Sequence, residues 1–231
     1  FSWEGKKNCC KAEGLFLSWR AEAQAHMTIQ FPEFEGFMKI GRLSREIIVT
    51  EKIDGTNGQI QINEDGRMFI GSRSQWIAEI VGDQVNYAAH AKSGKPVDNH
   101  GFAGWCFSNR DELQKLGIGR HFGEWWGAGI QRGYGLSEKR WSLFNISKWA
   151  DDSIRPKCCH VVPQLWAGDF DTPSIFAVMS ALGEHGSRAA PGFMNPEGVV
   201  IFHAQAHVLL KKTFEKDDAG KGREQIAPMS A

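Results

Sequence analysis

The sequence predicts an α+β fold in which antiparallel strands are flanked by helices. Residues 37–81 consist mostly of short apolar or alternating runs separated by turn signals, a pattern typical of β-structure. Two later segments, 102–116 and 173–182, have the apolar spacing or the end signals of helices. A final pair of apolar runs, 197–203 and 207–214, predicts two antiparallel strands.

The first two predicted strands are joined by a short turn, and a lysine lies just before this turn. Residues 47–50 form an apolar run that leads into Lys52, and residues 59–62 alternate between polar and apolar side chains. Asp54 and Gly55 lie between them and predict a tight turn. We therefore expect a strand, a turn and a second strand, with Lys52 where the first strand ends.

The other strands are predicted from local signals. Residues 68–71 follow an Asp-Gly hairpin signal at 65–66, whereas 76–81 is either the end of a strand or a turn. Residues 120–127 and 140–146 predict strands on either side of a Gly-rich loop. These segments complete the β part of the expected fold.

Both helices have recognisable signals. Residues 102–116 predict one helix, because Trp105 and Leu113 fall near one face. The second helix is predicted to carry Pro173 in its first turn and Gly183 just past its end. No internal repeat accompanies these elements.

Composition narrows the class of protein. The chain has 231 residues, of which 42% are hydrophobic and 23% charged, as in ordinary globular proteins. The sequence contains no apolar run long enough to span a bilayer, and its N-terminus lacks a secretory pattern, so we expect a cytoplasmic protein that does not bind membranes. The 27 basic and 27 acidic residues balance, which argues against a protein that coats nucleic acid nonspecifically.

The composition leaves two kinds of local site possible, a basic groove and a metal site that contains thiols. A basic groove is compatible with zero net charge, and its candidates are Lys39, Arg42, Arg45, Arg73, Arg132, Lys139 and Arg140. Cys158, Cys159 and His160 form either part of a metal site or ordinary buried or surface groups. The five cysteines lack a Cys-x-x-Cys spacing, and reduced thiols fit the cytosol.

The chain is predicted to contain one main domain. Residues 1–26 lack clean periodicity, and Met27 opens the segment that leads into the first predicted strand, so we expect an upstream or disordered extension at 1–26. The domain is expected to span 27–218, and the polar segment 219–231 is expected to be a flexible tail.

Lys52 is the leading candidate for chemistry. A lysine held at a turn between two strands can aim its amine at a ligand, and desolvation or nearby cations lower its pKa and favour attack by the neutral amine. The alternative is a surface lysine beside an Asp-Gly turn. The segments that decide between them are, in order, Lys52-Ile53-Asp54-Gly55, Gly71-Ser72-Arg73, Phe122-Gly123-Glu124-Trp125, Leu143-Phe144-Asn145-Ile146, Pro196-Glu197-Gly198 and Leu210-Lys211-Lys212.

This ordered set resembles the covalent nucleotidyltransferase superfamily of ATP-dependent RNA ligases, DNA ligases and capping enzymes. Residues 123–146 look most like the double-strand-type phage RNA ligases, and the resemblance covers roughly 31–218. It implies an ATP-grasp-like core of antiparallel sheets and helices, the adenylylation domain of ligases. It also implies a lysyl-AMP intermediate, AMP transfer to a 5′-phosphate and sealing by a 3′-hydroxyl, as in RNA repair. ATP and Mg²⁺ (or Mn²⁺) would be the cofactors, and RNA ends or a nicked duplex the partners of a monomer.

The resemblance also implies roles for individual residues. Lys52 would be the nucleophile, with Glu51 at the adenine edge. Arg73 would contact the ribose or the acceptor end. Glu124 would hold the ribose hydroxyls, and Phe144 would stack on the purine.

The remaining roles concern phosphate, metal and the later sealing step. Glu197 would bind the metal, and Lys211 would contact the α-phosphate. Lys212 also belongs to the candidate nucleotide-binding set, but neighbouring strand residues point to opposite faces, so we expect Lys211 inside the pocket and Lys212 outside. Asp54 and Asn57 flank the nucleophile, and Asn57 would take part in the later sealing step. An aspartate is commoner at position 54 in the wider superfamily, whereas the phage RNA ligases usually carry histidine.

Two other functions remain open from the residues: a DNA nick ligase of the same superfamily, and a noncatalytic nucleotide- or RNA-binding module. About twenty residues follow Lys211, too few for an oligonucleotide-binding barrel. We therefore expect a minimal ligase, a piece of a longer one, or an enzyme that adenylylates something else. A separate nucleic-acid-clamping domain or protein would assist the later steps.

Overall fold

The computed structural model describes Glu33, Gly36, Ile40, residues 44–89, Gly94 and residues 97–215. The chain falls into two units, Phe1–Ile40 and Gly41–Ala231, and every element described below belongs to the second. The predicted extension at 1–26, the suggested start at Met27 and the predicted tail at 219–231 lie outside the described residues.

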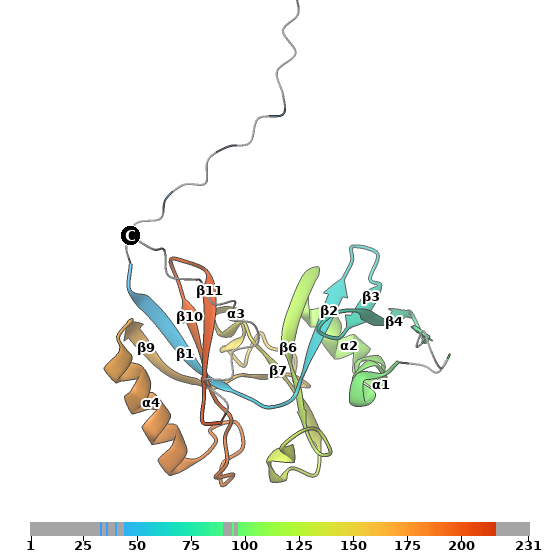
Figure 1. Ribbon diagram of the computed structural model, residues 1–231. Helices are drawn as coiled ribbons and strands as arrows, with labels where there is room; N and C mark the ends of the chain where they lie inside the picture. Colours follow the sequence, from blue (N-terminus) through green and yellow to red (C-terminus); the bar gives the residue numbers. More distant parts are fainter. Residues whose placement is uncertain are drawn as a thin grey trace, which may run out of the picture. The chain divides into compact units, whose positions relative to one another are not determined.

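Two sheets carry the fold (Figure 1). Sheet A has the order β11-β10-β1-β9, and its strands are β1 (Glu46–Lys52), β9 (Gln164–Asp169), β10 (Gly198–His203) and β11 (Val208–Thr213). Sheet B has the order β5-β4-β3-β2-β6-β7-β8. Its strands are β2 (Thr56–Ile62), β3 (Met68–Gly71), β4 (Trp76–Val81), β5 (Gln84–Tyr87), β6 (Gly119–Gly127), β7 (Lys139–Leu143) and β8 (His160–Val161). All pairings are antiparallel except β7 with β8, so the predicted α+β class with antiparallel sheets is confirmed.

Short helices connect the strands. The α-helices are α1 (Phe102–Ser108), α2 (Arg110–Leu113), α3 (Ile146–Trp149) and α4 (Thr172–His185). The 3₁₀ turns are η1 (Asn99–Gly101), η2 (Gln114–Leu116) and η3 (Gly133–Gly135). Across the described residues, no helix has both the length and the apolar character needed to cross a membrane.

The strand predictions hold except for one strand end and three strands that were not predicted. Residues 76–81 form a full strand, β4, which settles the alternative that the sequence left open. The strand predicted at 140–146 ends at Leu143, because the Asn145 side chain accepts a hydrogen bond from the Lys148 backbone and starts α3. The strands β5, β8 and β9 were not predicted; β8 has two residues, and most of β5 and β9 is exposed or half-buried.

The first helix prediction was wrong in its continuity. The segment 102–116 is broken at Asn109, whose φ of −112° and ψ of 15° interrupt the helix between α1 and α2. The Asn109 side chain donates to the Trp105 carbonyl and so takes part in this break. The second helix, α4, begins with Asp171 as its N-cap and continues through the predicted terminator Gly183 to His185.

Helix α1 covers one face of sheet B (Figure 1). The Phe102 ring packs against Trp125 of β6 and Trp141 of β7, with ring centroids 5.4 and 5.6 Å apart. A Cβ at Gly58 of β2 would lie 2.6 Å from Phe102 Cζ, so only glycine admits this ring. The core of sheet B is thus on the α1 face, and the opposite face carries the alternate residues.

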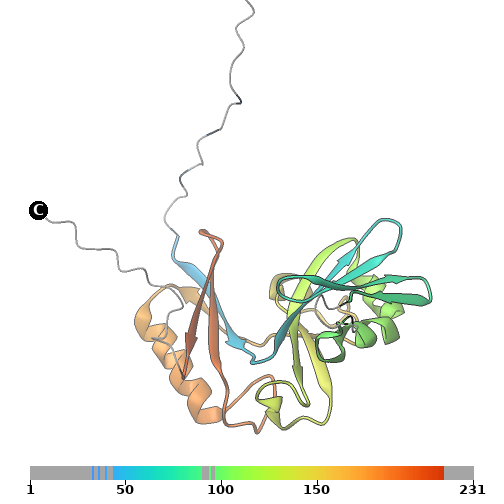
Figure 2. The same cartoon turned by 45° about the vertical axis from the view of Figure 1, so that its right-hand side comes forward.

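Helix α4 covers one face of sheet A (Figure 2). Ile175 and Met179 of α4 pack with Val49 of β1 and Val199 of β10 in one buried cluster. Because residues alternate along a strand, this packing leaves the other face of β1 for Thr50 and Lys52. The lysine therefore projects from the face of sheet A that α4 does not cover.

Candidate active site

Lys52 forms an ion pair with Glu197. The Lys52 Nζ lies 2.6 Å from Glu197 Oε2, and both side chains are partly buried. Lys52 pairs with Gly198, which begins β10, so the register of β1 and β10 places Glu197 beside the amine. Gly198 has a φ of +152°, and a Cβ there would lie 2.2 Å from the Lys212 carbonyl oxygen. Only glycine allows β11 to approach this closely while Glu197 stays at the strand entrance.

The turn after Lys52 brings the lysine next to sheet B. A Cβ at Gly55 would lie 2.5 Å from the Trp125 carbonyl oxygen and 3.0 Å from Glu124 Cγ. The backbone at Gly55 therefore runs directly against β6. Beyond the turn, Asn57 pairs with Glu124 across β2 and β6, and Asn57 Nδ2 donates to Glu124 Oε2 at 3.1 Å.

Glu124 carries a perturbed carboxyl group. Burial raises the pKa of Glu124 to about 7, and the Glu197 and Asp54 charges act in the same direction. The Lys52 ammonium and a backbone hydrogen bond from Gly55 oppose this shift. Four charged side chains from the two sheets and the connecting turn thus influence one another. Acidic groups with strongly shifted pKa values are common at functional sites.

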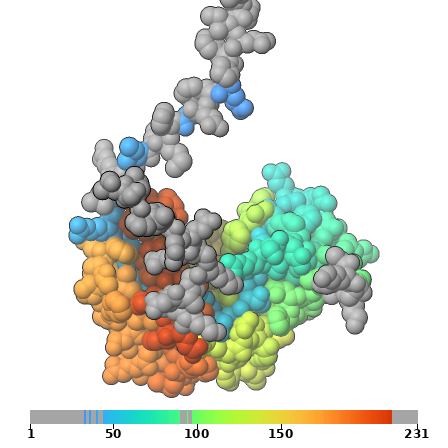
Figure 3. All heavy atoms as spheres, in the orientation of Figure 1, coloured from blue at the N-terminus to red at the C-terminus, as the bar shows by residue number. Residues whose placement is uncertain are grey.

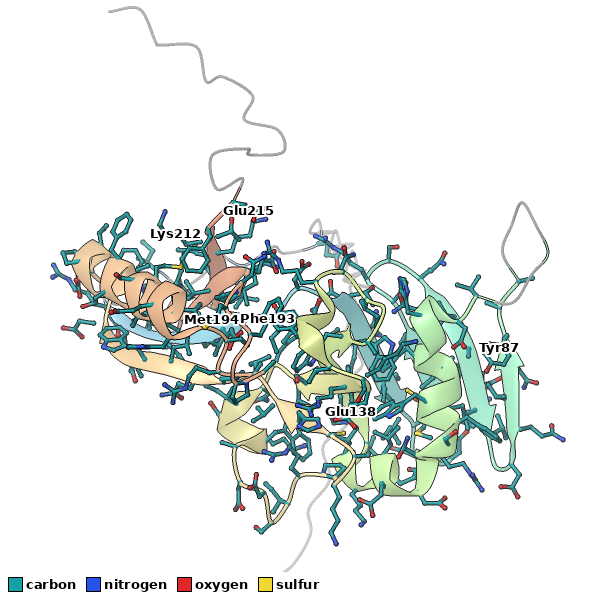
Figure 4. All side chains as sticks on the ribbon, turned by 90° about the horizontal axis from the view of Figure 1, so that it is seen from below. Tyr87, Glu138, Phe193, Met194, Lys212 and Glu215 are labelled. Atoms are coloured by element: carbon teal, nitrogen blue, oxygen red, sulfur yellow. The ribbon has the colours of Figure 1, made fainter. Side chains whose placement is uncertain are left out.

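The raised pKa of Glu124 predicts a pH-dependent stability. The folded state holds the proton of the Glu124 carboxyl more tightly than the unfolded chain does. The contribution of Glu124 to the free energy of unfolding is therefore complete below about pH 4.5 and is lost as the pH rises through about 7. Glu124→Gln removes the titration. The stability difference between wild type and Glu124→Gln should therefore change by about 2 kcal/mol between pH 5 and 8, measured by urea unfolding. Glu138→Gln, at an exposed carboxyl in the β6–β7 loop (Figure 4), is the control. An equal pH profile for wild type and Glu124→Gln would contradict the assignment.

Asp54 is held by two residues of the Gly-rich loop. Arg132 Nε lies 3.0 Å from Asp54 Oδ2, and the Asp54 backbone donates to the Tyr134 hydroxyl at 2.8 Å. Arg132 also donates to the Asn195 carbonyl at 3.3 Å, two residues before Glu197. Arg132 therefore connects the turn after Lys52 to the loop that carries Glu197. The sequence suggested Arg132 only as part of a basic groove and did not suggest Tyr134, because nothing local signals either contact.

Glu51 is a buried structural group in this structure. Its carboxylate is 1% exposed and accepts hydrogen bonds from the Ser187 hydroxyl at 2.5 Å and from the Arg188 and Ala189 backbones at 2.8 and 2.9 Å. Burial raises its pKa, and these hydrogen bonds oppose the rise. The expected contact of Glu51 with an adenine edge would compete with these three bonds.

The two adjacent lysines of β11 face opposite sides of sheet A. Lys212 pairs with Val199, which belongs to the α4 core, and its Nζ lies 4.9 Å from the Phe176 ring centroid of α4 (Figure 4). Lys211 pairs with Val200 and so shares the face of Lys52. Lys212 therefore lies on the face away from Lys52, as strand alternation predicted, and Lys211 lies on the face of Lys52.

Phe144 and Arg73 lie farther along sheet B. Phe144 follows β7, is 42% exposed, and its backbone donates to the Phe122 carbonyl, which continues the β6–β7 pairing by one residue. Arg73 is exposed in the turn between β3 and β4. The structure thus gathers Lys52, Asp54, Asn57, Glu124 and Glu197, with Phe144 just after β7, the strand next to Glu124. It places Arg73 beyond β2 and β3.

Glu197 is the residue expected to bind a metal ion. The described part of the chain contains no group of three or more His, Cys, Asp or Glu side chains that could hold a metal ion. Cys106, Cys158 and Cys159 are free cysteines, and Cys158 and Cys159 lie in contact with each other. Glu197 remains a candidate single carboxylate ligand, the number that Mg²⁺ commonly takes from a protein when phosphates complete its coordination.

The fold and site define an α+β protein in which a strand-terminal lysine lies between acidic groups. The family model for RNA ligases matches residues 45–219, and the chain belongs to this family. No curated protein matched the sequence.

Solved structures of Naegleria gruberi RNA ligase are similar to this chain. The structure with pyrophosphate has 16% identity and a TM-score of 0.48, over 73% of this chain and 49% of that one. A variant with ATP and manganese has 16% identity and a TM-score of 0.49, over 77% and 52%. A variant with AMP and manganese has 17% identity and a TM-score of 0.49, over 73% and 49%. The chain spans about half the length of these ligases.

Proposed function

We propose that this protein is the adenylyltransferase core of an ATP-dependent RNA ligase. The observation that carries the proposal is the position of Lys52, the last residue of β1. Its amine contacts Glu197 and lies within electrostatic range of Glu124. Membership of the RNA ligase family gives the class of reaction. Lys52 is the nucleophile of this proposal, and Glu197 and Lys211 assist it.

The amine must be neutral when it attacks. In the structure its partner is the Glu197 carboxylate, so the ion pair must open and the ammonium must lose a proton to water before the attack. Glu197 then stays ionised and free to hold the metal ion. The Lys52 nitrogen then forms a bond to the α-phosphorus of ATP, the bond from that phosphorus to the bridging oxygen breaks, and pyrophosphate leaves. Lys211, on the same sheet face, would stabilise the charge that develops on the α-phosphate.

The surrounding residues would bind the nucleoside. Glu124 and Asn57 form a hydrogen-bonded pair that can receive the ribose hydroxyls, and Phe144, just after the neighbouring strand β7, offers an exposed ring for the purine. Asp54, held by Arg132, would keep the turn after Lys52 in place. A Mg²⁺ or Mn²⁺ ion held by Glu197 together with the phosphates would neutralise charge on the leaving pyrophosphate.

The later steps would use RNA ends. AMP would pass from Lys52 to a 5′-phosphate, and a 3′-hydroxyl would then displace it to seal the strand. These steps would use a separate nucleic-acid-clamping domain or protein. The domain at 27–218, a monomeric state and a cytoplasmic location complete the proposal.

One gel tests the proposal. Wild-type protein is incubated with Mg²⁺ and either α-labelled or γ-labelled ATP and then separated under denaturing conditions. Covalent label from the α-position alone is expected. A wild type that is labelled by neither ATP nor GTP would contradict the proposal and favour a noncatalytic binding module. Labelled protein is next given nicked duplexes with RNA or DNA on the 3′-hydroxyl side, and sealing of the DNA form alone would indicate a DNA nick ligase.

A further inference from the structure

On the face of sheet B that α1 does not cover, a row of residues crosses four strands and continues to the residue after β7. In β2 and β6, Asn57 and Glu124 form one cross-strand pair, and Gln59 and Phe122 form the next pair on the same face. The ladder continues outward from Gln59 to Gly71 of β3 and from Gly71 to Trp76 of β4. On the other side, Phe144 continues the row beyond Phe122. This row lies two residues along the strands, about 7 Å, from the Asn57–Glu124 pair.

Three members of this row are exposed aromatic side chains. Phe122 is 49% exposed, and Trp76 and Phe144 are each 42% exposed. Phe122 and Trp76 stand three strands apart, which corresponds to about 14 Å. The atoms of β3 and β4, drawn in teal, lie at the molecular surface in the view of Figure 3. Large aromatic side chains exposed together on one sheet face indicate an interaction surface.

The Trp76 ring is held in place although it is exposed. A Cβ at Gly71 would lie 3.0 Å from Trp76 Cε3, so the absence of a side chain at Gly71 makes room for the ring on the sheet. Phe69 contacts it edge-on at a centroid distance of 6.0 Å, and the Arg120 guanidinium lies 5.4 Å from the ring centroid. A ring fixed in this way loses little conformational entropy when a ligand binds to it.

The charges around the row are complementary to a polyanion. The carboxylates of Asp65 and Glu79 both pair with Arg67. Among the described residues, Arg73 and Arg120 lack a salt bridge, and both are exposed. Arg120 lies two residues before Phe122 in β6 and therefore on the same open face. Arg73 lies in the turn that leads into Trp76. Exposed aromatic rings with neighbouring arginines are the combination that binds single-stranded nucleic acid.

We infer that the Phe122–Trp76 row is a stacking platform for unpaired bases of the RNA strand that leads to the site. Bases within a duplex are already stacked on one another, whereas unpaired bases can stack on aromatic side chains. Arg73 and Arg120 would contact the phosphates of the same strand. This inference rests on the proposed function, because it assigns to that site a substrate with a single-stranded segment next to the end that is sealed.

Binding of matched oligonucleotides tests the inference. A fluorescein-labelled RNA of about eight nucleotides is titrated by anisotropy as a single strand and as a duplex with its complement. Trp76→Ala and Phe122→Ala should each weaken single-strand binding about 5- to 150-fold, since each removes one stacked base. Phe176→Ala, at an exposed aromatic of α4 on sheet A, should bind single strands as tightly as wild type. The duplex should bind wild type, Trp76→Ala and Phe122→Ala equally.

The outcomes separate this inference from the proposed function. Thermal unfolding of each variant establishes that it is folded, and Arg120→Ala supplies a further variant of the same surface, expected to reduce the salt dependence of single-strand binding. Single-strand binding that is unchanged in both aromatic variants, or duplex binding that weakens as much, would overturn the platform. ATP labelling of the wild type reports independently on the proposed function. A labelled wild type with unaffected variants refutes only the platform, and an unlabelled wild type that binds single strands through Trp76 refutes only the adenylyltransferase.

Discussion

Replacing Lys52 with alanine is expected to reduce covalent labelling by α-labelled ATP by at least about 1,000-fold, because the variant lacks the amine that is proposed to form the bond to phosphorus. The amine lies 2.6 Å from Glu197, so its removal also leaves that carboxylate without its ion-pair partner. The measurement is the initial rate of labelling under denaturing analysis, with protein concentration and fold matched by circular dichroism.

Two further lysine variants sharpen this result. Lys211→Ala, on the same sheet face as Lys52, should slow labelling by about 10- to 1,000-fold, as expected for the loss of a group that stabilises transition-state charge. Lys212→Ala is the matched control, since the same side chain lies on the α4 face. Full labelling of Lys52→Ala would refute Lys52 as the nucleophile. A larger loss in Lys212→Ala than in Lys211→Ala would refute the assignment of the two faces.

Replacing Glu51 with alanine is expected to lower the free energy of unfolding by about 3 kcal/mol. The carboxylate is almost completely buried and is the acceptor for the Ser187 hydroxyl and for two backbone amides of the following turn. Truncation leaves these donors without their acceptor in a buried region, which costs about 1–3 kcal/mol for each affected group, less whatever a water molecule restores. The midpoint of urea unfolding, at constant m-value, measures the effect.

Glu46→Ala is the control for Glu51→Ala, because Glu46 begins the same strand but is exposed. Its stability should change by less than about 0.5 kcal/mol. Glu51→Gln should lie between the two, since its amide oxygen can still accept hydrogen bonds. If Glu51→Ala were as stable as Glu46→Ala, Glu51 would not hold the 187–190 turn, and its predicted contact with an adenine edge would return as the better explanation.

Local patterns predicted most of the strands because their signals lie within a few residues. The apolar run before Lys52 and the Asp-Gly hairpin at 65–66 each specify a strand or turn by themselves, and both are found in the structure. The helix at 102–116 was predicted as continuous because its apolar spacing spans the break. The break depends on the Asn109 side chain bonding to the Trp105 carbonyl, a choice that periodicity does not reveal.

The order of motifs along the chain identified Lys52, Glu124 and Glu197 as candidates and indicated the family, which the family model confirms. Their roles remain predictions. Strand alternation also indicated that Lys211 and Lys212 face opposite sides, because side chains in a strand alternate by geometry. These are properties that adjacent or ordered residues carry by themselves.

Tertiary structure alone decided which distant groups meet. Glu197 is 145 positions from Lys52, and only the pairing of β1 with β10 brings the two side chains into contact. Three other contacts likewise depend on the packing of separate strands and loops. They are the hydrogen bonds to buried Glu51 from residues near 188, the ion pair between Arg132 and Asp54, and the packing of the Trp76 ring on Gly71. A sequence pattern specifies which face a residue occupies, but the partner on that face is set by strand register and loop path, which local chemistry does not encode.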